Sequence, residues 1–170
     1  VLISSGGYSP IEAGLAMLPL PILMTAASPT MGGLAAKIGP RIPLTIGPVV
    51  VAVGMVLARM ITPEASYWAG AFPAILVMAL GMTIAVAPLT SSVLGSVEEQ
   101  HVAMASGFNS AVARLGGLIP TALLGGVLGR EGDALFEGFH GAMYVSGAAA
   151  AFAAVVAVTM LGGVRMRDSR

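Results

Sequence analysis

Long apolar stretches separated by short polar segments dominate the chain. Hydrophobic runs of about 18 or more residues with few charges are long enough to cross a bilayer as helices. Five stretches meet this description, so the pattern predicts an all-α integral membrane fold with five spans. These cover residues of about 11–31, 42–58, 68–97, 103–128 and 141–164.

The segments between the stretches collect most of the polar residues. Residues 62–68 (TPEASYW), 96–102 (SVEEQHV) and 129–140 (GREGDALFEGFH) are predicted to be loops. Tyr67 and Trp68 suit the headgroup level, where amphipathic aromatic rings concentrate.

Composition supports a chain embedded in lipid. Hydrophobic residues make up 56% of the 170 positions and charged residues 9%, whereas soluble domains carry about 25% charged residues. So few charges cannot cover a surface exposed to water, which argues against a soluble apolar bundle and makes the lipid bilayer the expected partner. The net charge of zero provides no basic face for nucleic acid. Without cysteine, neither a disulfide framework nor a thiolate metal site can form.

Lysine and arginine predict the orientation, because cytoplasmic loops carry an excess of them. When the sides are alternated from the N-terminus, one side has five cations and the other has two. The richer side holds Lys37, Arg41, Arg165, Arg167 and Arg170, and the other holds Arg59 and Arg130. We therefore expect the 165–170 tail in the cytoplasm and the N-terminus outside.

The sequence contains no constellation typical of an enzyme. His101 and His140 are predicted to lie on opposite sides of the membrane, so they cannot share a metal ion. No phosphate-binding G-x-x-x-x-G-K-[ST] motif is present. We therefore expect no enzymatic activity, cofactor or metal.

Arg114 is the one ionisable residue predicted well inside a span. An arginine at the centre of a membrane helix costs about 2.5–3.5 kcal/mol on insertion scales, and such residues usually face a polar partner or water. The alternative is a side chain that extends to the cytoplasmic headgroups. Asn109, five positions earlier, and Pro88, inside the third stretch, are further candidates for the transport pathway or its gating. Proline is also simply commoner in membrane helices than in soluble ones.

The stretch GGLAAKIGPR, Gly32 to Arg41, is predicted to be a tight cytoplasmic turn. Gly39 allows the chain to reverse, and Lys37 and Arg41 suit a position near anionic lipid. The stretch resembles the loop signature G-x-L-A-D-R-x-G-R-R of the major facilitator superfamily, with alanine at position 36 where the family has aspartate. The resemblance implies a gating role for this loop, which the missing carboxylate weakens. A simple cytoplasmic anchor is the alternative.

Three further stretches are similar to the fourteen-helix drug:proton antiporters of that superfamily. They are 7–19 (GYSPIEAGLAMLP), 80–97 (LGMTIAVAPLTSSVLGSV) and 104–125 (MASGFNSAVARLGGLIPTALLG). The resemblance implies that the chain is the last five helices of such a protein, in its C-terminal six-helix bundle, and that the whole N-terminal half is missing. The implied function is export of small amphipathic compounds in exchange for protons, with the coupling acids largely in the missing half. A helical membrane scaffold or assembly protein without transport activity is the alternative.

Overall fold

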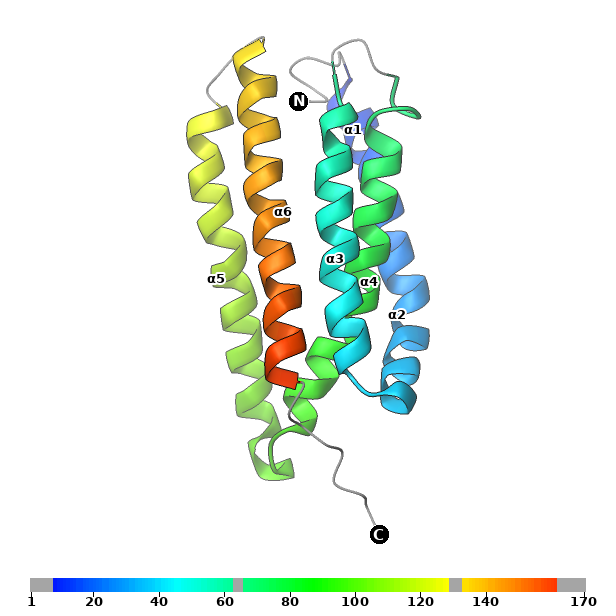
Figure 1. The fold of residues 1–170 in the computed structure, drawn as a ribbon, viewed down its shortest axis with the longest axis vertical. Coiled ribbons are helices and arrows are strands. Elements are labelled where there is room, and N and C mark those ends of the chain that lie inside the picture. The colour runs from blue at the N-terminus through cyan, green and yellow to red at the C-terminus, as the bar shows by residue number, and fades with distance from the viewer. Residues whose placement is uncertain (1–7, 63–65, 129–132, 162–170) are drawn as a thin grey trace.

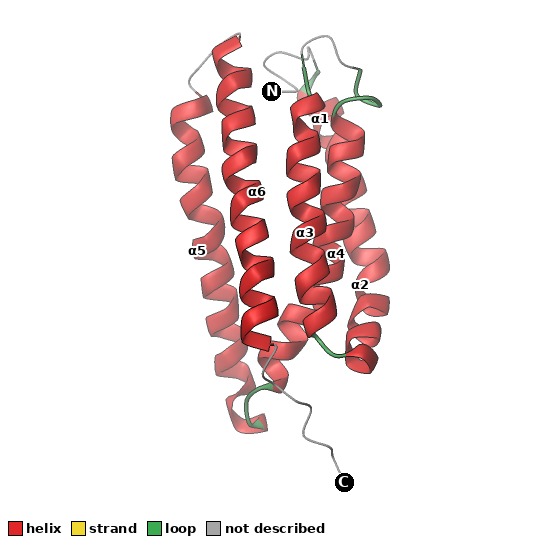
Figure 2. Cartoon of the chain, viewed as in Figure 1, coloured by secondary structure: helices red, strands yellow, loops and turns green. Residues whose placement is uncertain are grey.

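The architecture is an up-and-down arrangement of long helices that lie side by side (Figure 1). It was obtained as a computed structural model, which describes residues 8–62, 66–128 and 133–161. These residues form helices, turns and loops but no strand (Figure 2). The elements are α1 (Pro10–Met17), α2 (Pro19–Ile38), α3 (Arg41–Leu57), η1 (Ala58–Met60), α4 (Ala71–Gly95), η2 (Glu99–His101), α5 (Val102–Leu128) and α6 (Asp133–Leu161).

α1 and α2 form one long path with a break at Leu18. α1 begins with a capping box, in which the side chains of Ser9 and Glu12 each accept a hydrogen bond from the other residue's backbone N–H. Pro19 and Pro21 have no N–H, so the carbonyls four residues before them lose their usual helical donors. The break therefore follows directly from the position of these two prolines.

The first reversal occupies fewer residues than the predicted turn over residues 32–41. The predicted span of 11–31 is too short, because α2 continues to Ile38 and the residues after position 31 include no proline that would stop it. The chain turns only at Gly39 and Pro40. Gly39 has a φ of 84° and a ψ of 155°, a combination that is essentially restricted to glycine. Gly39 therefore lies at the reversal with a backbone conformation that suits glycine.

α3 and α4 approach each other closely at glycines. A Cβ atom on Gly47 would lie 2.6 Å from the Cβ of Ala85, and one on Gly81 would lie 2.6 Å from the backbone nitrogen of Val51. A Cβ on Gly54 would lie 2.8 Å from a backbone nitrogen of α4. Small residues let membrane helices pack with their backbones nearly in contact, and these glycines therefore fix the pairing of α3 with α4.

α6 is longer at its start than expected. The sequence predicted a loop over 129–140 and a span over 141–164, but α6 begins at Asp133, so the second part of that loop is helical. No proline interrupts 133–140, and polar residues are tolerated in a helix end that reaches the membrane surface. Gly147 of α6 packs on α3, where its Cβ would lie 3.4 Å from the Met55 side chain. Residues 129–132 and 162–170, including the predicted tail, lie outside the described residues.

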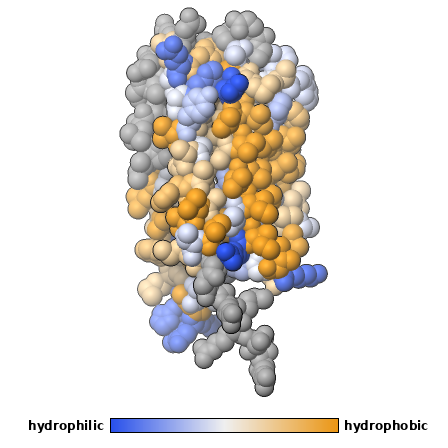
Figure 3. Space-filling model, in the orientation of Figure 1, coloured by the Kyte–Doolittle hydropathy of each residue, from blue (hydrophilic) through white to orange (hydrophobic). Residues whose placement is uncertain are grey.

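Four helical stretches in the described part of the chain are long and apolar enough to cross a membrane. They are Pro10–Ile38, Arg41–Met60, Ala71–Gly95 and Ala134–Met160. α5, with 27 residues, is not among these four, and most side chains of its second half lie outside the described set. The predicted span over residues 103–128 therefore stays a prediction. Apolar residues cover much of the middle of the molecule, and hydrophilic residues gather toward both ends (Figure 3).

Candidate functional site

The predicted cytoplasmic loop joins two helices and also reaches a third. Lys37 lies in the last turn of α2, where a cation interacts favourably with the helix dipole. Arg41 begins α3, and its Nη2 donates a hydrogen bond of 3.4 Å to the carbonyl of Val158 in the last turn of α6. Carbonyls in the last turn of a helix have no helical N–H donor, so the Arg41 side chain supplies a donor to the carbonyl of Val158. Gly32 lies inside α2 with open space where a Cβ would be, so neither packing nor backbone conformation requires glycine there.

Pro88 marks a disturbed section of α4. Its side chain is fully buried, and because proline has no N–H, the carbonyl of Ile84 loses its helical donor. One turn later, the hydroxyl of Ser91 donates to the carbonyl of Ala87 (2.7 Å) and that of Ser92 donates to the carbonyl of Pro88 (2.6 Å). Such bonds back to the preceding turn tend to bend helices. The last part of α4 passes behind α3 toward α5 in Figure 1.

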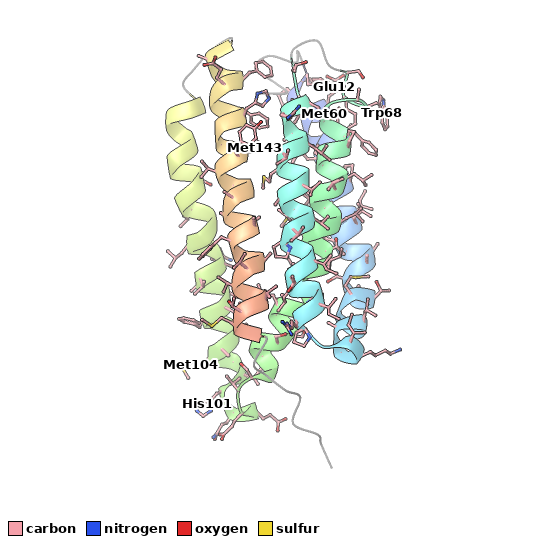
Figure 4. The ribbon with its side chains drawn as sticks, in the orientation of Figure 1. Glu12, Met60, Trp68, His101, Met104 and Met143 are labelled. Atoms are coloured by element: carbon pink, nitrogen blue, oxygen red, sulfur yellow. The ribbon has the colours of Figure 1, made fainter. Side chains whose placement is uncertain are left out.

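Three different faces divide the surface of α5. The bundle face consists of Val102, Ala105 and Asn109, which are the only residues between 102 and 118 that are not largely exposed. The apolar face carries bulky side chains, and Figure 4 shows one of them, Met104, on the side of α5 that points away from the other helices. Its members are Met104, Phe108, Val112, Leu115 and Leu118. The polar face consists of Ser106, Ser110, Arg114, Gly117 and Thr121, all exposed.

Arg114 and Asn109 therefore lie on different faces of α5. At about 100° per residue, five positions place them about 140° apart around the helix. The structure shows no hydrogen bond or ion pair between the Arg114 side chain and any other described residue. It brings Arg114 together with Ser110 on the polar face and places Asn109 toward the bundle.

At the opposite end from the loop, an aromatic cluster lines a groove of about 520 Å³. The rings of Tyr67, Trp68 and Phe72 have centroids 5.0–5.8 Å apart. The Tyr67 hydroxyl donates a hydrogen bond of 2.8 Å to the carbonyl of Ala16, beside the α1–α2 break. Burial raises the pKa of Tyr67, with a smaller contribution from Tyr8, and the raised pKa favours the protonated hydroxyl that donates this hydrogen bond. Figure 4 shows Glu12, Met60 and Trp68 at this end and His101 at the other.

The described residues contain no group of three or more metal-ligating side chains. His140 lies within α6, and its Nε2 is 3.2 Å from the carbonyl of Ile61, so this nitrogen carries the proton. The nearest acid to His101 is Glu98, with 3.9 Å between Nδ1 and the carboxylate at an exposed position. The two histidines are therefore at opposite ends, as the sequence predicted, and their contacts are local.

Two features of the site were missed in the sequence. Gly47, Gly54 and Gly81, at which α3 packs on α4, have no sequence motif that distinguishes them from the other glycines of the chain. The polar face of α5 could have been found, because Ser106, Ser110, Arg114, Gly117 and Thr121 follow each other at spacings of three or four. Asn109, which was considered together with Arg114, does not fall in that register.

Comparisons with known proteins give a consistent answer. The sequence model of the Major Facilitator Superfamily matches residues 2–169. The Multidrug resistance protein Stp of Mycobacterium tuberculosis is 30% identical over 122 residues, which are 72% of this chain and 22% of that protein. The Tetracenomycin C resistance and export protein of Streptomyces glaucescens is 29% identical over 129 residues, which are 75% of this chain and 24% of that protein.

The chain thus spans less than a quarter of the length of these relatives. No solved structure matches it. The family match, by contrast, extends over nearly every residue and agrees with the all-helical, apolar architecture. This chain belongs to the major facilitator superfamily.

Proposed function

We propose that the chain is the C-terminal part of a secondary active transporter that exports small amphipathic compounds in exchange for protons. Its similarity to a multidrug resistance protein and to an antibiotic resistance and export protein supports this function. The short share of each relative that it covers supports a longer transporter, whose N-terminal half precedes these residues. Family membership makes the chain a multi-pass membrane protein and not an enzyme. The alternative of a scaffold without transport activity is not favoured by these relatives.

The polar face of α5 is the observation that carries the proposal. A helix in lipid needs apolar residues on every side that contacts hydrocarbon, and the apolar face of α5 meets that need. The polar face instead suits a surface covered by water, substrate or protein. Alternating access moves two bundles around a site near the bilayer midplane, and Arg114 is near the middle of α5.

Pro88 and the loop residues Lys37 and Arg41 would serve the movement of this bundle. Neighbouring helices and local adjustments can satisfy backbone groups freed by a proline, so membrane helices tolerate such breaks. We assign the bend of α4 near Pro88 a role in gating. Arg41 would keep the cytoplasmic ends of α3 and α6 together while the helices move.

The proposed orientation places the end with Lys37 and Arg41 in the cytoplasm. The turn between α2 and α3 and the η2 segment lie at one end of the bundle, while η1 and the start of α4 lie at the other (Figure 1). Cations near the cytoplasmic side and aromatic rings at an interface both agree with this arrangement.

The test is drug export by the full-length transporter with Arg114→Ala. We expect export to fall strongly at an unchanged membrane level, and Arg114→Lys to restore it only in part, because an ammonium group cannot replace the planar fork of donors. Arg59→Ala is the matched control, since Arg59 is an exposed cation at a helix end. Export at the wild-type rate by Arg114→Ala would show that Arg114 is only an anchor, and the site assignment would then fail.

A further inference from the structure

We propose that the groove beside Tyr67 and Trp68 binds a phospholipid with an ethanolamine headgroup. The ammonium group of this lipid contacts the Glu12 carboxylate, and an acyl chain covers the apolar part of the groove. The lipid belongs to the leaflet opposite to Lys37 and Arg41. The inference goes beyond the proposed function, because neither an exported compound nor protons take part in it.

Charge and aromatic rings favour a cation at one end of the groove. Glu12 is the one charged side chain among the described residues that line it. Its Oε2 accepts a hydrogen bond of 2.9 Å from the backbone N–H of Ser9, which holds the carboxylate at the start of α1. The rings of Tyr67, Trp68 and Phe72 line the same groove, and the faces of such rings attract cations. A carboxylate beside aromatic rings therefore suits an ammonium group and disfavours an anionic one.

The aromatic cluster is fixed to the helical path that carries Glu12. The Tyr67 hydroxyl donates its hydrogen bond to the carbonyl of Ala16, four residues after Glu12. The Trp68 ring packs edge-on against Tyr67 and contacts Phe72 at the start of α4, yet it stays 71% accessible. The acid and the rings are thus held in one groove, with an indole face still open to a ligand.

Depth in the membrane favours a lipid over a soluble amine. Glu12 is twenty-five residues from Lys37 along α1 and α2, which at about 1.5 Å per residue is at most about 38 Å. This length exceeds the hydrocarbon core of about 30 Å but fits within the whole bilayer of about 40–45 Å. When Lys37 lies among the headgroups of one leaflet, Glu12 therefore reaches the headgroups of the other.

The opposite end of the groove extends into the hydrocarbon. Ile22 is ten residues beyond Glu12, which places it up to about 15 Å deeper. Leu15, Leu18 and Ile22 line this part, and all three side chains are exposed. A phospholipid has the same order of parts, with a charged headgroup followed by an acyl chain. A soluble amine would cover only the end with Glu12 and leave the leucines and Ile22 exposed.

The first experiment measures headgroup selectivity in the purified full-length transporter, depleted of lipid in detergent. Phosphatidylethanolamine should raise its apparent unfolding temperature by several degrees more than phosphatidylglycerol with the same acyl chains. Glu12→Gln should remove most of this difference, and it keeps the helix cap, because a capping box accepts Gln as well as Glu. Glu99→Gln is the matched control, since Glu99 is an exposed acid at the other end of the bundle, and it should keep the difference.

Two results of this experiment would overturn the proposal. One is an equal shift from both lipids, or a difference that Glu12→Gln leaves intact. The other is the same shift from free phosphoethanolamine at an equal concentration, because this compound has no acyl chain and would reveal a site for soluble amines.

The second experiment locates the lipid. A photo-crosslinking amino acid replaces Leu15, in the groove, or Ile46, an exposed apolar residue of α3 that does not line it. The full-length transporter is irradiated in bilayers that contain equal amounts of the two lipids, and the adducts are identified by mass spectrometry. Position 15 should link to phosphatidylethanolamine several-fold more than to phosphatidylglycerol, and position 46 should show no preference. Equal adducts at position 15, or linkage there to protein alone, would show that this lipid does not occupy the groove.

Discussion

Gly81→Ala provides the most direct test of the close contact between α3 and α4. The new Cβ would lie 2.6 Å from the backbone nitrogen of Val51 and 2.8 Å from the carbonyl oxygen of Gly47, whereas ordinary van der Waals contact begins at 3.4 Å. The difference between 3.4 Å and 2.6 Å is 0.8 Å, and both opposing atoms belong to the backbone of α3. No side-chain rotation can relieve the clash, so the two helices must separate.

Overpacking of this kind costs about 1–3 kcal/mol. We therefore expect Gly81→Ala to lower the apparent unfolding temperature of the full-length transporter in detergent by several degrees. Gly14→Ala is the matched control, because it also lies in a helix but its Cβ would meet nothing within 4 Å. That change should leave stability unchanged or raise it slightly, since alanine favours a helix over glycine. If Gly81→Ala melts with the wild type, α3 and α4 are not in backbone contact in the membrane.

Three other predictions concern the ends of the bundle. Gly39→Ala should lower the free energy of unfolding by about 1–3 kcal/mol, because the φ of 84° and ψ of 155° suit only glycine. Gly33→Ala, within α2, is the control and should not lower it. Equal free energies of unfolding for the two variants would contradict the turn conformation. Tyr67→Phe should cost about 0.5–1.5 kcal/mol for the lost hydrogen bond. Because the pKa of Tyr67 is raised from 10.0, its contribution should be complete below about pH 10 and be lost as pH rises through the higher folded-state pKa; a Phe variant with an identical pH profile would refute it. In a cysteine-free transporter, Ser66→Cys should react with an impermeant thiol reagent added outside intact cells and Gln100→Cys should not; the reverse would invert the orientation.

The sequence by itself determined the fold class and the family. Runs of about 20 apolar residues satisfy all their backbone hydrogen bonds only as helices when lipid surrounds them, so hydropathy alone was sufficient to predict an all-helical membrane protein. The chain reversal at Gly39 could also be predicted from the sequence, because glycine tolerates backbone conformations that other residues rarely adopt. Helix ends were less certain: nothing in the local pattern marked residues 32–38 and 133–140 as helical, and the polar residues there suggested loops.

The tertiary structure decided which residues share a surface. Glycines are frequent in this chain. Only the packing of α3 on α4 shows that positions 47, 54 and 81 leave no room for a larger residue than glycine. In the same way, the sequence marked Arg114 as an unusual cation and Asn109, five positions earlier, as a further candidate. The fold turns Asn109 toward the bundle and Arg114 away from it. Helical periodicity relates residues within one helix, but the side of a helix that meets its neighbours depends on contacts between segments far apart in the chain.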